Sequence, residues 1–322
     1  MTTSSGTPSS QRAIDSPERL RATTAAVRVS LRWFGISRSL NSEQKAEAAE
    51  TFGAHNGFIS ASKRLLDVKH PAFRAVTGIR GRVQSFWKGM SLPYPEPGIR
   101  LIRRTDIDPF NEHMTGLRGE LGEAVEQLDE RYSEMKTAAR TRLGRLFNAT
   151  DYPSSLCGLF AVEWDFPSVE PPDYLRQLNP QLFEQECLRV ASRFNEALQL
   201  AEQAFLDELT NLIAHLTERL TGTTDGKPKV FRDSAVTNLV EFFDRFRSLN
   251  VRSNGELDEL VSQAQQLIQG LQPQSLRDNH VLRQTAASEL GQLQETLDGL
   301  LVDRPRRNIL RRSPLSATQE AA

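Results

Sequence analysis

The residues best suited to bind a ligand lie in one basic stretch, residues 60–104, which contains ten Lys and Arg residues and two acidic ones. Clustered cations attract phosphate groups, and single-stranded nucleic acid also needs aromatic faces on which its bases stack. Three of the cations fall on one face of a helix that we predict over residues 71–90, and a tyrosine follows in a proline-rich loop. Our candidates for binding nucleic acid or an acidic partner are Arg74, Arg82, Lys88 and Tyr94.

The same basic residues have a second interpretation, because they could form a solvated face or pair with the acidic residues of this chain. The aromatic residues Phe73, Phe86 and Trp87 recur at spacings of three and four along the apolar stripe of the predicted helix, so we expect them in the core. On the cationic face, Gly78 and Gly81 would let a phosphate or a backbone approach closely. The sequence leaves both interpretations open.

No group of residues indicates catalysis. The densest cluster of potential metal ligands consists of Asp106, Asp108, Glu112 and His113. Acids at the start of a helix also cap it and interact favourably with its dipole, and we prefer that explanation. Cys157 lies among apolar residues, which disfavours a reactive thiolate. The chain has no phosphate-binding glycine loop, zinc-type cysteine pairing or nucleophile-elbow serine, so we predict no enzyme activity, cofactor or metal.

Trp164 is the remaining residue that stands out, in the segment Glu163–Pro167. A large aromatic side chain with a polar edge can anchor a partner protein at an interface. It can also act as a buried staple between helices, which we favour. Both interpretations remain open.

The elements that must position these residues are mostly helices. Apolar residues at helical spacing predict helices over residues 41–49, 71–90, 108–146, 183–220, 236–246, 257–271 and 277–302. The helix that starts at Asp108 extends for almost forty residues with near-heptad spacing. Alternation from Val27 to Trp33 predicts one strand, for which Ile99–Ile102 is the best candidate partner.

The distribution of charge divides the chain further. Residues 1–104 carry a net charge of +10, residues 105–303 carry −15 and residues 304–322 carry +4, whereas the total is only −1. We predict a mainly α protein in which long antiparallel helices form a coiled coil or bundle beside a small basic α/β head. The predicted domains are a disordered N-terminus at 1–23, the head at 24–104, the long-helix body at 105–302 with a connector at 149–180, and a disordered basic tail at 303–322.

Composition excludes some classes of protein. No stretch of the sequence is long and apolar enough for a transmembrane span. The polar residues Met1–Ser10 lack the apolar region of a secretory signal. Two cysteines are too few for a disulfide framework, so we expect a reduced, cytoplasmic protein.

One stretch of the chain, residues 58–103, resembles a family of bacterial and phage proteins that is grouped as a domain of unknown function. The stretch includes HPAFRAVTGIRGRVQSFWKG and SLPYPEPGIRLI, and the similarity extends over about residues 27–172. The resemblance implies a mostly helical protein. Some relatives are encoded near AAA+ ATPases of the MoxR type and near von Willebrand A-domain proteins, which implies a component of an assembly.

Two functions are consistent with these features. The first is a non-enzymatic scaffold or adaptor that self-associates or docks partner proteins along its helices, in a bacterial or phage-type assembly that could include an AAA+ ATPase. The second is a nucleic-acid-binding protein that uses the basic head, with the helical body as its oligomerisation module. The heptads do not distinguish an intramolecular contact from an intermolecular one.

Overall fold

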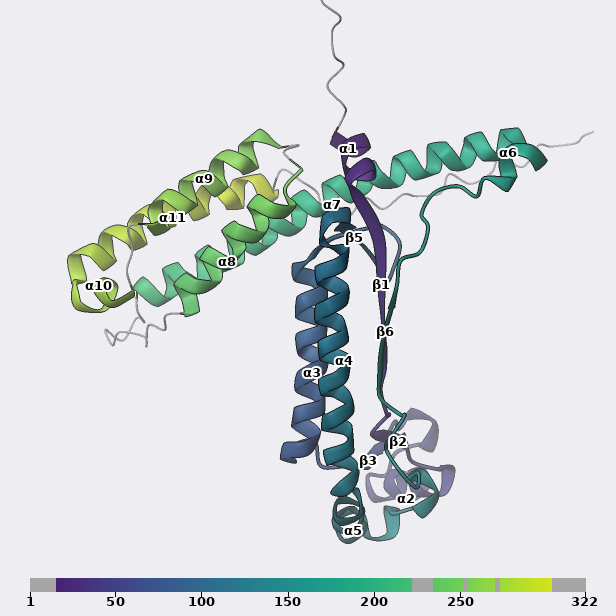
Figure 1. Ribbon diagram of the computed structural model, residues 1–322. Coiled ribbons are helices and arrows are strands. Elements are labelled where there is room, and N and C mark those ends of the chain that lie inside the picture. The colour runs from purple at the N-terminus through teal and green to yellow at the C-terminus, as the bar shows by residue number, and fades with distance from the viewer. Residues whose placement is uncertain (1–15, 222–233, 252–253, 270–272, 303–322) are drawn as a thin grey trace, which may run out of the picture. The chain divides into compact units, whose positions relative to one another are not determined.

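The computed structural model describes residues 16–221, 234–251, 254–269 and 273–302 of the 322-residue chain (Figure 1). These residues divide into two compact units, with the boundary between Leu198 and Gln199. Helices dominate both units, and the strands form small antiparallel sheets in the first unit, which confirms the predicted mainly α class. The predicted disordered tail, residues 303–322, lies outside the described part of the chain.

The first unit begins with a helix in a segment for which we predict disorder. Residues 1–15 lie outside the described residues, but the next residues form α1 (Ser16–Thr23), and its Leu20 is buried. The prediction was therefore wrong for α1, where one apolar side chain fixes a short helix. The elements that follow are β1 (Thr24–Arg32), β2 (Ser37–Ser39), α2 (Ser42–Thr51), η1 (Asn56–Phe58), β3 (Ser62–Arg64), α3 (Pro71–Gly89), β4 (Ser91–Pro93), β5 (Ile99–Arg103), η2 (Arg104–Asp106), α4 (Ile107–Glu130), α5 (Tyr132–Leu143), η3 (Gly144–Leu146), η4 (Ala149–Asp151), β6 (Ala161–Asp165), α6 (Tyr174–Leu178) and α7 (Pro180–Thr221).

The larger sheet joins segments that are far apart in the sequence. Its order is β4-β5-β1-β6, and each pair of neighbours is antiparallel. The predicted pairing of the first strand with Ile99–Ile102 is confirmed by the β1–β5 register. The last strand, β6, comes from the predicted connector 149–180, and its Val162 lies opposite Leu31 of β1. The apolar patch 156–166 of this connector is compatible with a short strand or a loop from the sequence alone, and the structure forms the strand.

The two faces of the sheet have different chemistry because side chains alternate along β1. Val27, Val29 and Leu31 point to the face that is covered by helices, where Val27 is fully buried. Arg28 and Arg32 point to the opposite face and are exposed. The alternation predicted from the sequence is thus present in the second half of β1, where one face packs and the other remains polar, whereas Thr24 and Ala26 near its start are buried.

Helices α3 and α4 form an antiparallel hairpin against the apolar face of the sheet (Figure 1). The Phe86 ring near the end of α3 stacks on the Phe110 ring near the start of α4, with centroids 5.5 Å apart. The apolar stripe of α4, from Phe110 to Leu128, is buried in the same core as Val76 and Val83 of α3. The predicted boundary between residues 104 and 105 is therefore not a boundary in the structure, because α4 buries its stripe on the elements that precede it.

The long helix predicted from Asp108 to Leu146 is interrupted. α4 begins at Ile107 and ends at Glu130, and α5 follows after Arg131. Near this break, the Asp129 carboxylate accepts hydrogen bonds from the Leu156 amide at 2.6 Å and the Ser155 hydroxyl at 2.9 Å. Apolar periodicity continues across the break because α5 also faces the common core, so the sequence pattern alone could not reveal it.

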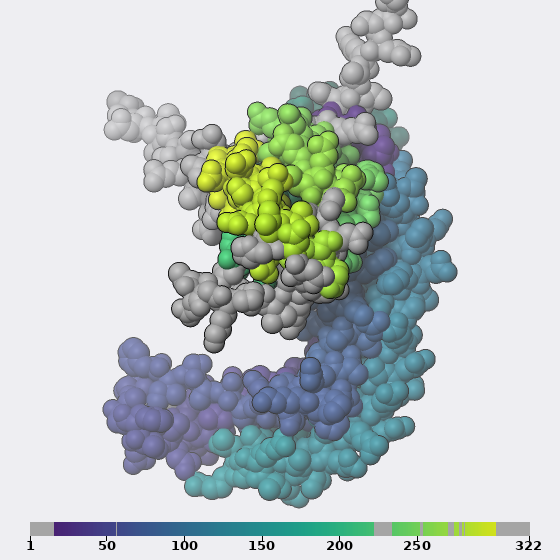
Figure 2. Space-filling view, turned by 90° about the vertical axis from the view of Figure 1, so that its left-hand side faces the viewer, coloured from purple at the N-terminus to yellow at the C-terminus, as the bar shows by residue number. Residues whose placement is uncertain are grey.

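A small lobe, residues 34–66, lies beside α5 in the first unit, where Figure 2 shows it in purple at the lower left. It contains the β2–β3 pair and α2, whose capping box between Asn41 and Gln44 confirms the predicted helix start. Lys63 of β3 is buried, and its ammonium donates to the Leu146 carbonyl at 2.7 Å and pairs with the Asp151 carboxylate at 2.7 Å. These contacts tie the lobe to the segment after α5.

The second unit is a helical bundle. The part of α7 from residue 199 onward packs with α8 (Ser234–Leu249), α9 (Gly255–Gln269), α10 (Pro273–Asp278) and α11 (His280–Val302). Phe205 of α7 contacts Phe246 of α8 edge-on, with ring centroids 5.0 Å apart. The helices predicted after residue 180 are all present, whereas the antiparallel coiled coil between the two long helices is not confirmed: the helix along α4 is α3. None of the helices in the described residues is long and apolar enough to cross a membrane.

Candidate functional site

The predicted cationic face is present on α3. Arg74, Arg82 and Lys88 are all exposed, and so are Gly78 and Gly81 between them. A Cβ atom added at either glycine would meet nothing within 4 Å, so the face is open to close approach. The helical spacing therefore placed these residues correctly on the side of α3 that faces away from the core.

The charge on this face is partly neutralised. Arg82 forms an ion pair with Glu120 of α4, and the hydrogen bond from Arg82 lowers the pKa of the Glu120 carboxyl. Both side chains are about half exposed, so the pair adds little to stability. It does, however, neutralise Arg82, which is then less available to bind a phosphate group. Arg74 and Lys88 flank this pair.

The same neutralisation recurs throughout the first unit. Basic residues before position 105 pair with acidic residues after it, as the second interpretation of the charge distribution proposed. The pairs are Arg21–Glu170, Arg28–Asp165, Lys63–Asp151 and Arg82–Glu120. Reversed pairs, Glu47–Arg145, Asp67–Arg142 and Glu96–Arg193, also cross position 105. Within this unit, the segments before and after position 105 therefore neutralise part of one another's charge.

Tyr94 is buried, whereas a side chain that stacks on nucleic-acid bases must be exposed. The sequence analysis placed it in an open proline loop, but only 6% of the side chain is exposed. Its ring contacts the Phe194 ring of α7, with centroids 5.7 Å apart. Burial raises the pKa of Tyr94, although the nearby Arg193 guanidinium acts in the opposite direction. The expectation of an exposed Tyr94 was therefore wrong, because the loop folds against α7.

Trp164 links β6 to α4. Its indole N–H donates to Asn111 Oδ1 at 2.7 Å, and the Arg118 guanidinium lies 5.0 Å from the ring centroid in a cation–π contact. The side chain is half-buried on the helix-covered face of the sheet. This arrangement fits the staple interpretation, with a strand and a helix as the two elements that it joins.

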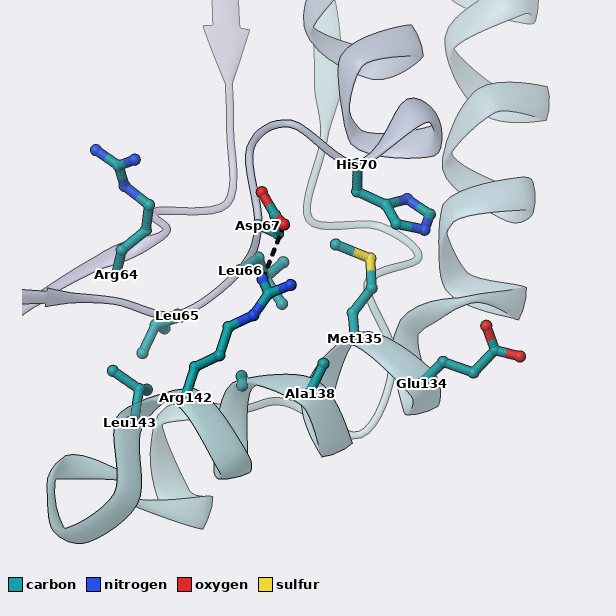
Figure 3. Close-up of a pocket in the computed structure, with 11 residues that line it drawn as sticks. Arg64, Leu65, Leu66, Asp67, His70, Glu134, Met135, Ala138, Arg142 and Leu143 are labelled. Atoms are coloured by element: carbon teal, nitrogen blue, oxygen red, sulfur yellow. Dashed lines mark hydrogen bonds and ion pairs between the residues drawn. The ribbon is translucent and has the colours of Figure 1, made fainter.

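A cavity lies between the segment before α3 and helix α5 (Figure 3). It encloses about 390 Å³. Its lining combines apolar side chains with charges of both signs: Arg64, Leu65, Leu66, Asp67, His70, Glu134, Met135, Ala138, Ala139, Arg142 and Leu143. In Figure 3 the Arg142 and Asp67 side chains meet across the opening, while His70 and Met135 lie to one side.

Two charged residues of this cavity, Asp67 and Arg142, pair with each other. The Asp67 carboxylate accepts from the Lys69 amide at 2.9 Å and from the Arg142 guanidinium at 2.8 Å. The Lys69 amide first, and then Arg142, lowers the pKa of Asp67, which keeps it ionised at neutral pH. The buried Nδ1 of His70 has no hydrogen-bond partner in the described residues. The lining contains no serine, threonine, cysteine or lysine side chain that could act as a nucleophile.

The acidic and histidine cluster near the start of α4 is likewise used for packing. The Asp106 carboxylate accepts from Arg103 at 2.7 Å, and the His113 ring lies 3.9 Å from the Phe86 ring. No group of three His, Cys, Asp or Glu side chains suited to a metal occurs in the residues that the structure describes. Of the two free cysteines, Cys157 is exposed and Cys187 is half-buried.

A different surface, which the sequence analysis missed, carries the clearest interaction signal. Large apolar side chains are exposed on α6 and on the first turns of α7: Tyr174, Leu178, Leu182 and Leu188. We call these four residues the α6–α7 surface. The stripe used to predict α7 runs through Phe183, Cys187 and Val190, so Leu182 and Leu188 project from other sides of the helix. Apolar residues off the stripe were the signal that could have revealed them.

Comparison of the chain with protein-family models, with curated proteins and with solved structures finds no match in any of the three. No family is therefore assigned, and the resemblance of residues 27–172 stays a prediction.

Proposed function

We propose that this protein is a non-enzymatic scaffold or adaptor that self-associates through the α6–α7 surface. The observation that carries the proposal is the exposure of three leucines and a tyrosine within fifteen residues, with Leu178 at 77% and Leu188 at 72%. Contiguous exposed apolar patches on water-soluble proteins commonly mark interaction sites. Burying Leu178 or Leu188 would stabilise an assembly by up to about 1.5–3 kcal/mol each, and burying Leu182, which is 37% exposed, would contribute less.

The spacing of the leucines favours a second copy of this chain as the partner. Leu182 and Leu188 lie three residues on either side of Gln185. If two copies of α7 pair antiparallel about a twofold axis at Gln185, each Leu182 lies opposite the Leu188 of the other copy. A twofold interface requires this kind of self-complementarity. The predicted antiparallel coiled coil would then be formed between copies.

The charges beside this surface are compatible with such pairing. Glu186 and Arg189 form an ion pair within α7 at 2.8 Å, and Arg193 pairs with Glu96 at 3.3 Å. The Glu186–Arg189 pair is neutral, which lowers like-charge repulsion between two copies, whereas the exposed Glu184 has no ion pair in the described residues.

The double variant Leu182→Glu/Leu188→Glu tests the proposal. In sedimentation of the full chain, we expect the wild type at twice the monomer mass and the variant at the monomer mass. Val281→Glu is the matched control, because Val281 is also 72% exposed on a helix but lies in the second unit. A monomeric wild type, or a variant that remains dimeric, would contradict the proposal. Far-UV circular dichroism shows whether the variants stay folded.

The alternative function, nucleic-acid binding through the head, has less support from the geometry. Arg82 is paired with Glu120, and Tyr94 is buried. Only Arg74 and Lys88 of the four candidates remain as exposed cations for which the structure shows no ion pair in the described residues. We therefore base the proposal on the α6–α7 surface and keep an AAA+ ATPase as a partner that only the resemblance implies.

A further inference from the structure

Strand β6 leaves one edge of the larger sheet open in the described residues. It is the last strand in the order β4-β5-β1-β6 and pairs only with β1. The opposite edge is protected, because β4 has three residues and ends in Pro93. β6 has five residues and no proline, so every second residue presents an N–H and a C=O to solvent. An edge of this kind can accept another strand.

A groove runs beside this edge, between β6 and α4. It encloses about 390 Å³ and is separate from the cavity of Figure 3. Its floor is apolar and includes Leu121, Val125 and Val162. One wall is Gly122 of α4, where an added Cβ would meet nothing within 4 Å. The open edge of the sheet and the apolar groove are therefore adjacent. Strand addition needs this arrangement, because the edge pairs with the backbone of the added strand and the groove takes its side chains.

The alternation along β6 defines the chemistry of a strand that pairs with it. Side chains on the helix-covered face lie beside Val162 and Trp164, above the groove, and should be apolar. Side chains on the opposite face lie beside Glu163 and Asp165 and should be basic. Asp165 already pairs with Arg28, whereas Glu163 is exposed and the structure shows no ion pair for it.

We propose that β6 and its groove form a binding site for an extended peptide in which basic and apolar residues alternate. The peptide pairs antiparallel or parallel with β6, inserts an apolar side chain between β6 and α4, and places cations on the opposite face beside Glu163. Glu163 is exposed on that face, and on the side of α4 the exposed Glu126 stands against one lining cation, Arg118, which is held over the Trp164 ring. The charge of the rim therefore selects a basic partner. This site is separate from the α6–α7 surface.

Gly122→Leu provides a decisive variant, because it fills the groove from an exposed helical position. Leucine has the higher helix propensity, so the fold should not be weakened. The probe is a fluorescent peptide, at least as long as β6, in which lysine alternates with valine. We expect it to bind the full chain and to bind Gly122→Leu about tenfold to hundredfold more weakly, which corresponds to the loss of one buried apolar side chain.

Gly116→Leu is the matched control, because Gly116 is also an exposed glycine of α4 with open space around its Cβ position and does not line the groove. Its affinity for the probe should equal that of the wild type. Glu163→Lys should weaken the binding of the lysine peptide and strengthen the binding of a matched peptide that carries glutamate in place of lysine. Equal binding of the probe by wild type and Gly122→Leu, or no saturable binding, would overturn the proposal.

Cys157 gives a local readout because it is exposed and lines the groove. A bound peptide should slow alkylation of Cys157, as followed by mass spectrometry, and unchanged alkylation under saturating peptide would contradict binding at this site. The chain itself contains a basic segment with two apolar residues, 304–312. If a chain that ends at residue 303 binds the probe more tightly than the full chain, that segment is an occupant of the groove. If the affinities are equal, the occupant is a separate peptide.

Discussion

The two units of the molecule differ in how far apart in the sequence their contacting residues lie. In the first unit, β1 pairs with strands that lie more than 65 residues later in the chain, and Tyr152 donates to the Leu65 carbonyl across 87 residues. In the second unit, the helix contacts are mostly between neighbours in sequence: α8 with α9, and α10 with α11. Closing long loops costs entropy before any contact forms, whereas neighbouring helices pack at little such cost. The first unit therefore depends on long-range polar and apolar links, and the second on its local apolar stripes.

The aromatic residues allow the two units to be observed separately. All three tryptophans and all four tyrosines lie before residue 199. Tryptophan fluorescence and tyrosine absorbance therefore report on the first unit alone, whereas far-UV circular dichroism reports on the helices of both.

The largest difference in stability between the two units should come from Phe242→Ala in the second unit. Phe242 is 1% exposed and contacts the rings of Phe205, Phe243 and Phe246. Removing it leaves a cavity and should reduce the free energy of unfolding of this unit by about 3–5 kcal/mol. We expect the circular-dichroism transition to shift to lower denaturant concentration while the fluorescence transition stays in place. A parallel shift of the fluorescence transition would show that the units do not unfold independently.

The next effect concerns the first unit and its link between the small lobe and the segment after α5. Asp151→Asn should cost about 3 kcal/mol, because it leaves the buried Lys63 ammonium without its counter-charge. The double variant Lys63→Met/Asp151→Asn removes both charges, so no buried charge is left without a partner, and it should cost much less. Denaturant titration followed by fluorescence measures both variants. Equal destabilisation by the two would show that the ion pair itself, rather than an unpaired buried charge, determines the cost.

The same contrast explains which parts of the fold the sequence could predict. The stripes that define α3, α7, α8, α9 and α11 are local, so their helices were predicted close to their observed bounds. The patch that contains β6 could be a short strand or a loop on the sequence alone, and only its pairing with β1, more than 120 residues away, identifies it as a strand. The break after Glu130 was missed because α5 continues to face the same core.

Prediction of interaction residues followed the same limits. Periodicity placed Arg74, Arg82 and Lys88 on the exposed side of α3, but it could not show that Glu120 lies opposite Arg82. Tyr94 was placed wrongly because its contact with Phe194 spans 100 residues. The exposed leucines of the α6–α7 surface were overlooked because a search for one apolar stripe discards apolar residues that project from other sides of a helix.

The smallest effect is a dependence on alkaline pH that should be confined to the first unit. Burial raises the pKa of Tyr132 to about 12, and burial also raises the pKa values of Tyr94 and Tyr152. In the unfolded chain these phenols ionise near pH 10. Since the folded pKa is the higher one, the stabilisation is complete below pH 10 and is lost as the pH rises from about 10 to about 12. Absorbance of tyrosinate should lag behind that of the unfolded chain over this interval.

Tyr132→Phe separates this titration from packing. The Tyr132 hydroxyl has no hydrogen-bond partner in the described residues, so its removal should change stability at pH 7 by less than about 1 kcal/mol. The variant should lose less stability than the wild type between pH 10 and pH 12, as measured by fluorescence, because one raised pKa has been removed. Because the second unit contains no tyrosine, the absorbance of tyrosinate reports on the first unit alone. If the wild type and Tyr132→Phe lose stability equally over this interval, ionisation of the Tyr132 phenol does not destabilise the folded state.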